Sequence, residues 1–196
     1  MALAIKQNQK YTFADYEAWP EDERWEIIEG IPYAMTAPSR LHQKIVLKLG
    51  NQIDQYFDGK PCEIYPAPFN VRLPVENEAD EFIETTVEPD LSIICDPDKL
   101  DDKGCRGAPD WIIEVLSPST TLRDMNTKRD LYQQHGVKEY WIVHPLEHWV
   151  MIYTLDEQGN YAKPLVVGMD EVTPVNLFAD LTVDWDFLLE QKQQSF

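Results

Sequence analysis

Three ionisable residues stand in or beside segments that should be buried. Asp90 opens the apolar run 90–95, Glu114 lies inside the apolar run 111–116, and Lys128 follows on a segment expected to be helical. An unpaired charge in a buried strand is costly, so two carboxylates there need a partner. A divalent metal is one such partner. Two carboxylates that hold a metal beside a lysine are the equipment of a site that cleaves phosphodiester bonds.

Each of these residues also has a plainer explanation. Asp90 would cap a turn at the start of its strand, and Lys128 would point from its helix into solvent. Glu114 would form a buried ion pair with an arginine or lysine, because buried acids are usually paired. Taken singly, Asp90 and Lys128 favour the plainer explanation and Glu114 is evenly balanced, whereas the two acids taken together favour a site.

The two apolar runs are expected to be strands that bring the acids together. Both runs are rich in Ile and Val, as strands are, and the polar loop 96–109 joins them. Antiparallel pairing puts the start of the first beside the end of the second, which places Asp90 near Glu114 and Val115. Opposed residues lie ~5 Å apart, a gap that one divalent ion can bridge. Asp110 lies ~13 Å from Glu114 along the strand, so we assign it to strand entry.

The remaining pattern predicts an α/β fold with a mixed sheet of few strands. A hairpin is expected over 25–35, turning at Glu29-Gly30, and a helix that ends at Gly136 is expected to begin at Asp124. A second helix is expected over 39–56, where Ser39 can cap and apolar residues recur at helical spacing. The other expected elements are a helix over 12–19 and strands over 69–73, 139–143, 150–155 and 182–185. No repeat or linker divides the chain, so residues 1–196 are predicted to form a single domain.

Composition and cysteine content bear on the cellular location of the protein. Its 196 residues are 43% hydrophobic, which suits a globular protein. No apolar run approaches the ~18 residues of a membrane span, and the first residues lack the apolar core of a signal peptide. The three cysteines have no zinc-type spacing, and their odd number suggests free thiols. We therefore expect a cytoplasmic protein with no membrane partner.

The charge balance opposes a simple nucleic-acid-binding role. Seventeen basic and 35 acidic residues give a net charge of −18. Proteins that bind nucleic acid usually present a basic surface to the phosphates. This chain should repel DNA at long range unless a local basic patch, a metal or a partner compensates.

Four stretches resemble the Uma-type family of "putative restriction endonucleases". They are 87–91 (VEPDL), 107–120 (GAPDWIIEVLSPST), 128–132 (KRDLY) and 136–143 (GVKEYWIV). The resemblance runs from about Tyr11 to Leu189, and the second stretch is long and specific. It implies a PD-(D/E)XK nuclease fold: a restriction-endonuclease-like core with a mixed β-sheet flanked by helices, plus an N-terminal hairpin and extra C-terminal strands.

The resemblance also implies roles for particular residues. Asp90 and Glu114 match the two acids of the motif and would bind Mg²⁺ or Mn²⁺, helped by the carbonyl of Val115. The lysine that ordinarily lies two residues after the second acid is absent, because Leu116 stands there; Lys128 on the next helix takes its place.

Two further positions match accessory residues of the family. They are Glu26 in the early hairpin and His42 at the start of the first core helix. A salt bridge on the face of the hairpin is the alternative for Glu26, and a polar residue at a helix N-terminus is the alternative for His42.

The leading hypothesis is therefore a metal-dependent endonuclease acting on nucleic acid, DNA first. Lys128 would orient or deprotonate the attacking water. A homodimer would place one site on each strand, with the apolar, Trp/Tyr-rich C-terminal half as its contact. The net charge and the missing lysine at position 116 motivate one alternative, a non-catalytic interaction module that keeps the fold. Metal-assisted hydrolysis of a small phosphoester is the other.

Overall fold

The computed structural model describes residues 9–20, 22–118 and 120–189. A six-stranded main sheet has the order β12-β11-β10-β9-β6-β3. Its neighbours are antiparallel except for β9 and β10, which run parallel, so the sheet is mixed. The strands are β3 (Glu63–Pro66), β6 (Leu91–Ile94), β9 (Trp111–Val115), β10 (Glu139–His144), β11 (Trp149–Thr154) and β12 (Leu165–Gly168).

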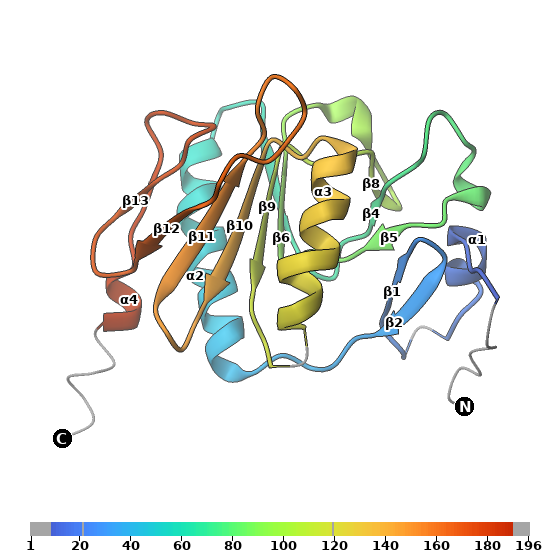
Figure 1. Cartoon of the computed structure of the whole chain (residues 1–196), viewed down its shortest axis with the longest axis horizontal. Helices are drawn as coiled ribbons and strands as arrows, with labels where there is room; N and C mark the ends of the chain where they lie inside the picture. The colour runs from blue at the N-terminus through green and yellow to red at the C-terminus, as the bar shows by residue number, and fades with distance from the viewer. Residues whose placement is uncertain (1–8, 21, 119, 190–196) are drawn as a thin grey trace.

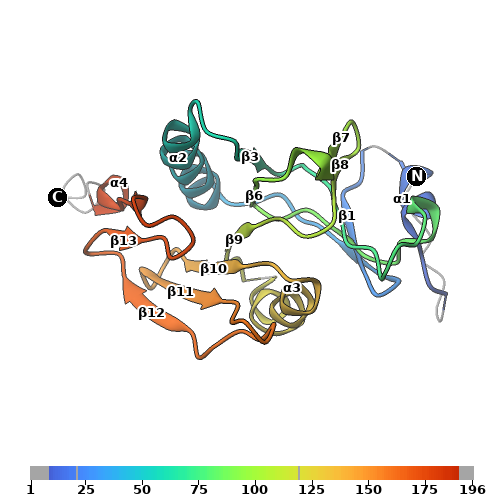
Figure 2. The ribbon, with the colours of Figure 1, turned by 90° about the horizontal axis from the view of Figure 1, so that it is seen from above.

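Helices cover both faces of this sheet. Helix α2 (Arg40–Phe57) lies on one face and α3 (Arg129–His135) on the other, as the two views in Figures 1 and 2 show. Alternate residues of β9 join the two core clusters: Ile113 and Val115 pack with α2, whereas Ile112 packs with α3. Side chains along a strand alternate between its faces. Glu114 therefore belongs to the face that α3 covers.

The predicted pairing of the two acid-bearing strands is confirmed. β6 and β9 are antiparallel, with Leu91 opposite Ile113 and Ile93 opposite Trp111. One step further along this register, Asp90 comes beside Glu114. The segment that joins the strands is more ordered than the expected loop, because residues 96–109 contain the short helix η2 (Pro97–Lys99) and strands β7 (Leu100–Asp101) and β8 (Gly104–Arg106). Strands this short carry no readable periodicity.

A second mixed sheet lies beside the main one, in the order β2-β1-β5-β4-β8-β7. It contains the expected hairpin of β1 (Trp25–Ile28) and β2 (Ile31–Ala34), which turns at Glu29 and Gly30 with φ of 51° and 81°. Its two further strands are β4 (Val71–Arg72) and β5 (Thr86–Val87). Figure 1 shows the hairpin beside α1 (Phe13–Glu17).

The long helix before the site begins where the sequence predicts. Ser39 is the N-cap of α2, and its hydroxyl accepts the amide N–H of His42 at 3.2 Å. The cap fixes the first turn of the helix, which carries His42.

The helix after β9 departs from a regular α-helix. Residues Arg123–Lys128 (η3) form a π-helical turn that continues into α3, and the left-handed Gly136 (φ 83°) ends the helix as expected. Beyond β12, the chain adds short elements: β13 (Thr173–Pro174), β14 (Thr182–Val183) and α4 (Asp186–Leu189), while η1 (Asp80–Phe82) lies in the earlier part.

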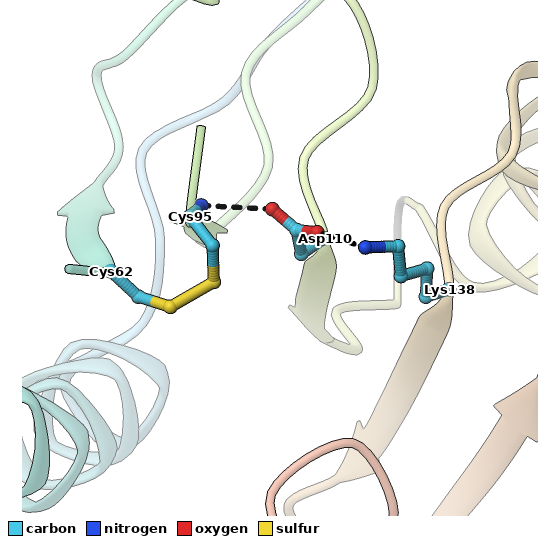
Figure 3. Close-up of a disulfide and its surroundings, with 4 residues drawn as sticks. All are labelled: Cys62, Cys95, Asp110 and Lys138. Carbon is cyan, nitrogen blue, oxygen red and sulfur yellow. Dashed lines mark hydrogen bonds and ion pairs between the residues drawn. A yellow bond between two sulfur atoms is a disulfide. The ribbon is translucent and has the colours of Figure 1, made fainter. Parts of the chain in front are cut away.

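The expectation of free thiols is wrong for two of the three cysteines. Cys62 and Cys95 form a disulfide, shown in Figure 3, and Cys105 is free and buried. The antiparallel register of β3 and β6 explains the bond. Because Glu63 pairs with Ile94, the preceding and following cysteines lie opposite each other. The disulfide removes the support that free thiols gave to a cytoplasmic location.

Asp110 lies at strand entry, as expected. Its carboxylate accepts the Cys95 N–H at 2.8 Å and the Lys138 ammonium at 2.6 Å (Figure 3). It thus ties the loop after β6 to the segment that leads into β10.

The predicted fold class is confirmed: α/β, with mixed sheets flanked by helices, an N-terminal hairpin and extra C-terminal strands. Within the described residues, no helix combines the length and the apolar character needed to cross a membrane.

Candidate active site

A cavity of about 940 Å³ brings the five predicted side chains together. Its lining includes Glu26 from β1, His42 from α2, Asp90 from the start of β6, Glu114 from β9 and Lys128 from η3. These elements are distant in sequence and meet because the hairpin and α2 lie beside the same ends of β6 and β9. Asp90, Glu114 and Lys128, which the sequence grouped together, thus line one cavity. The accessory residues Glu26 and His42 line it too.

Asp90 is held from two sides. Its Oδ2 accepts the backbone N–H of Val115 at 2.8 Å and lies 3.0 Å from Nε2 of His42. Both contacts use the same oxygen, so among the described residues Oδ1 has no hydrogen-bond donor. Asp90 therefore joins β6 to β9 and to α2 while it keeps one oxygen for a ligand.

Glu114 is buried, with 4% of its surface exposed. Its Oε1 accepts the ammonium of Lys128 at 2.7 Å and the hydroxyl of Tyr132 at 2.9 Å. Among the described residues, its Oε2 receives only a long contact of 3.4 Å from the Asp90 N–H. One oxygen of Glu114 is thus fully engaged, and the other lies next to Asp90 with little competition.

Lys128 lies at the centre of a carboxylate cluster. Its Nζ is 2.7 Å from Oε1 of Glu114, 2.7 Å from Oε1 of Glu26 and 3.8 Å from Oδ1 of Asp124. The residue is only 3% exposed. The interpretation of Lys128 as a solvated helix lysine is therefore wrong, because the π-turn directs it inward.

Arginines border the cluster. Arg123 Nη1 is 3.5 Å from Oε2 of Glu26, and its guanidinium lies over the ring of Tyr33. Arg24 pairs with Glu88. Both arginines line the cavity, and each is engaged by a carboxylate. They form the more accessible part of the site, with side chains 37% and 19% exposed for Arg24 and Arg123.

The charges in the cluster shift one another's pKa values. Burial raises the pKa of Glu114 well above its usual value of 4.5, against the opposing charge of Lys128. The nearby carboxylates of Asp124, Asp90 and Glu26 add to this rise. Burial also raises the pKa of Asp124. Such shifts are expected where carboxylates outnumber cations in a buried site.

The pKa of Lys128 shifts upward, whereas burial alone lowers the pKa of a lysine. Burial lowers its pKa, but the carboxylates of Glu114, Glu26 and Asp124 outweigh burial, so that the pKa lies well above 10.5. The ammonium is therefore charged at neutral pH. A charged lysine can attract or orient an anion or a water molecule.

The donor set suits a hard divalent cation. Carboxylate oxygens are the ligands that Mg²⁺ prefers, and it commonly uses one or two of them together with water and substrate phosphate. Asp90 Oδ1 and Glu114 Oε2 are two such oxygens on adjacent strands. Among the described residues, no group of three or more His, Cys, Asp or Glu side chains is arranged as a metal site. The arrangement therefore fits a two-carboxylate Mg²⁺ or Mn²⁺ site, not a site enclosed by protein ligands.

Sequence reasoning missed two residues of the cluster, Asp124 and Tyr132. Asp124 is expected only as the start of a helix, but it is 2% exposed and lines the cavity. Tyr132 is fully buried and donates to Glu114. The signal was present, because both lie four residues from Lys128 and such spacing places side chains on one helix face.

The plainer explanations of the acids are only partly correct. Glu114 does form a buried ion pair, but its partner is Lys128, so the ion pair and the site coincide. Glu26 does form ion pairs from the hairpin, and they lie buried inside the cluster, where Glu26 is 1% exposed. His42 is buried and contacts Asp90.

A mixed sheet between helices, with an Asp, a Glu and a Lys gathered at one end of two central strands, defines a protein of the nuclease fold. The chain belongs to the Uma2 family, described as "Putative restriction endonuclease", whose model matches residues 13–186.

Two further comparisons found similar proteins. A solved structure from Anabaena variabilis ATCC 29413, described as "a putative nuclease belonging to DUF820", superimposes with a TM-score of 0.72 over 91% of this chain and 97% of its own, at 20% identity. That likeness shows the fold. A relative from Synechocystis sp., the uncharacterized protein slr1290, is 27% identical over 150 residues, which cover 75% of each chain.

Proposed function

We propose that this chain is a metal-dependent endonuclease that hydrolyses phosphodiester bonds in nucleic acid, with DNA as the first substrate to test. Membership of the Uma2 family supports a nuclease-like function. The observation that carries the proposal is the meeting of Asp90, Glu114 and Lys128 in one cavity. The metal dependence and the substrate are the parts that go beyond the family assignment.

Asp90 and Glu114 would hold Mg²⁺ or Mn²⁺, with the carbonyl of Val115 as a third ligand. A bound cation would polarise a phosphoryl oxygen and lower the pKa of water. The protein's own part is to position and to neutralise. His42 holds the carboxylate of Asp90 by its Oδ2, and Tyr132 holds that of Glu114 by its Oε1. Oδ1 of Asp90 and Oε2 of Glu114 are thereby left to bind the cation.

Lys128 would orient the attacking water or bind the scissile phosphate as a cation. Its raised pKa favours these two roles over deprotonation of the water, the other role considered from the sequence. Glu26 would keep the ammonium in place through its 2.7 Å contact. Arg123, about one-fifth exposed, would meet the flanking phosphate. Preorganised charges of this kind stabilise the charge that develops on phosphate.

The test is plasmid cleavage by purified protein with Mg²⁺ or Mn²⁺. We expect nicking that Asp90→Asn abolishes and that EDTA stops. Asp98→Asn, which changes an exposed aspartate in the loop beyond the same strand, is the matched control and should leave cleavage intact. Folded wild-type protein that cleaves neither single- nor double-stranded DNA or RNA would refute the proposal.

A small phosphoester is the second candidate substrate, and the cavity favours it. The cavity is of the size that binds small molecules, and its walls include exposed Leu47 (61%) and Leu146 (70%). The net charge of −18 disfavours a polyanion. Activity on dinucleotides or bis(p-nitrophenyl) phosphate, without activity on polymers, would select this candidate.

We propose a homodimer as the working form, but with a different contact from the one that the sequence suggested. Four aromatic residues of the C-terminal half, Tyr140, Trp141, Tyr153 and Trp185, are buried in the core and are not available for a contact, whereas Trp149 and Tyr161 are partly buried. Edge strand β12 instead exposes Leu165 and Val166, each by 53%. Light scattering on the wild type and on Val166→Lys tests this: the variant should be monomeric if β12 forms the contact.

A further inference from the structure

Asp124 is a buried carboxylate for which the proposed mechanism has no use. It is 2% exposed, lines the cavity, and its Oδ1 has no hydrogen-bond partner among the described residues. Leaving a buried charged oxygen without a hydrogen bond is costly, so such a group calls for an explanation. The nearest cation is Lys128, whose Nζ is 3.8 Å from this oxygen, too far for a hydrogen bond.

The π-turn is what brings Asp124 to this place. Residues Arg123–Lys128 form one π-helical turn, a rare element that is frequent at functional sites. The turn is fastened to the sheet, because the hydroxyl of Tyr140 on β10 donates to the backbone carbonyl of Asp124 at 3.0 Å. Asp124 and Lys128 are therefore held on one side of the helix, over the end of β9.

Lys128 has two close acceptors and one distant one. Its contacts to Glu114 and Glu26 are both 2.7 Å, whereas Asp124 is more than 1 Å further away. Glu114 is also a proposed metal ligand. A divalent cation on Glu114 repels an ammonium that shares the same carboxylate. Loading of the site would therefore weaken the contact between Glu114 and Lys128 and leave Glu26 as the one close acceptor of the lysine among the described residues.

We propose that Asp124 is a positioning residue whose free Oδ1 accepts the ammonium of Lys128 once Glu114 binds a divalent cation. The exchange keeps the lysine beside the site, bridged between Glu26 and Asp124, and prevents it from turning into solvent. Only a small movement of the side chain is needed, because Oδ1 already lies 3.8 Å from Nζ. This inference rests on the proposed function, since it presupposes a cation at Glu114.

A crystal structure of the wild-type protein with Mn²⁺ tests the exchange directly. We expect Nζ of Lys128 to lie about 2.7–3.2 Å from Oδ1 of Asp124, a hydrogen-bond distance, and to have left Oε1 of Glu114. Mn²⁺ bound with the lysine still on Glu114, or with the lysine turned into solvent, would overturn the inference. This measurement does not depend on the folding of any variant.

Variants supply the second test. Asp124→Ala should lower kcat by about 10- to 100-fold, the usual effect of losing a supporting partner of a metal site. Asp124→Asn keeps an acceptor oxygen and should lose less. Mn²⁺ affinity by calorimetry should also fall in Asp124→Ala and fall less in Asp124→Asn, because a contact that forms only when the cation is bound contributes to cation affinity. A purely structural role would instead lower thermal stability and leave both the kcat and the Mn²⁺ affinity of the folded protein unchanged.

Asp130→Asn is the matched control, because Asp130 lies on α3 with its side chain 67% exposed and, in the part of the chain that the structure describes, forms an ion pair only with Arg129. It should behave as the wild type. Wild-type cleavage together with unchanged kcat in both Asp124 variants would refute this inference and leave the proposed function standing. A wild type that neither binds Mn²⁺ nor cleaves would refute both.

Discussion

At the scale of single residues, the site is an excess of buried carboxylates around one lysine. Glu26, Glu114 and Asp124 all lie within 4 Å of Nζ of Lys128. Breaking a buried ion pair from one side leaves uncompensated charge and is strongly destabilising. Lys128 therefore supports the fold of the site as well as its chemistry.

Removal of the ammonium should expose this dependence. Lys128→Met keeps the bulk of the side chain, and we expect it to lower the free energy of unfolding by about 3–5 kcal/mol, measured by urea denaturation at pH 8. The loss should be smaller at pH 5, where the carboxyl groups can take up protons. Lys48→Met, at an exposed position of α2, is the control and should change stability by less than about 0.5 kcal/mol. A cost below about 1 kcal/mol for Lys128→Met at pH 8 would contradict this view of the cluster.

The raised pKa of Glu114 predicts a pH dependence of stability. A carboxyl whose pKa is higher in the folded state stabilises the fold at low pH, and this contribution is lost as pH rises from its usual value of 4.5 through the raised one. Lys128, with a pKa above 10.5, stays charged throughout this window. The metal-free wild type should therefore lose melting temperature relative to Glu114→Gln between pH 5 and pH 8.

The metal should reverse this trend, because cation binding requires the ionised carboxylate. We expect the gain in melting temperature from Mn²⁺ to be larger at pH 8 than at pH 6 in the wild type and to be absent in Glu114→Gln. A wild type that gains stability relative to Glu114→Gln as pH rises would show that Lys128 depresses the pKa of Glu114.

At the scale of elements, the site depends on how helices and strands end. Ser39 caps α2 at the turn that carries His42, and Gly136 ends the helix that carries Lys128. Gly136 has a φ of 83°, and a Cβ there would meet no atom within 4 Å. Only backbone conformation opposes a side chain at this position.

A pair of glycine substitutions separates backbone strain from packing. Gly136→Ala should destabilise the protein by about 1 kcal/mol, because a left-handed conformation disfavours any Cβ. Gly50→Ala lies within α2, where a Cβ would make an ordinary 3.6 Å contact with Leu91, and should stabilise by up to about 1 kcal/mol. Thermal unfolding of both variants gives the comparison. Equal effects of the two substitutions on stability would contradict the left-handed conformation of Gly136.

The disulfide joins elements at the opposite end of β6 from Asp90. It closes a segment of 33 residues, for which a chain-entropy estimate gives about 3–4 kcal/mol. We expect Cys62→Ser/Cys95→Ser to lose stability of this order in urea and to keep its Mn²⁺ affinity. The wild type in dithiothreitol should match the double variant, since Cys105 is already free. Loss of Mn²⁺ binding on reduction would show that the strand end and the site are coupled.

At the scale of the whole molecule, the acidic surface limits how a polyanion can bind. The net charge is −18, and the cations that line the cavity, Arg24, Arg123 and Lys128, are each paired with a carboxylate. Few counterions can be released when nucleic acid binds. Affinity should therefore depend on salt much less than it does for a basic nuclease.

This weak dependence is measurable. A plot of log K against log salt for single-stranded DNA should have a slope of about −1 to −2, and Arg123→Gln should reduce its magnitude by about 1. Fluorescence anisotropy with Ca²⁺ in place of Mg²⁺ provides the data. A slope steeper than about −4 would mean that a basic surface outside the cavity binds the strand.

The sequence by itself determined the local features. The apolar runs in 90–95 and 110–116, a capped amphipathic helix over 39–56 and a hairpin at Glu29-Gly30 each depend on neighbours within a few residues, and all were predicted. The antiparallel pairing of the two strands then followed, and with it the closeness of Asp90 to Glu114.

Only the tertiary structure decided which distant groups meet. The approach of Lys128 to Glu26, the inward position of Asp124 and the pairing of Cys62 with Cys95 depend on a π-turn and on strand register between segments far apart in sequence. Neither the π-turn nor the strand register leaves a periodic pattern in the sequence. A π-turn adds one residue to a helical turn and so redirects the side chains that follow it. The same sequence spacing would have allowed Lys128 to face solvent; the turn places its charge among the carboxylates.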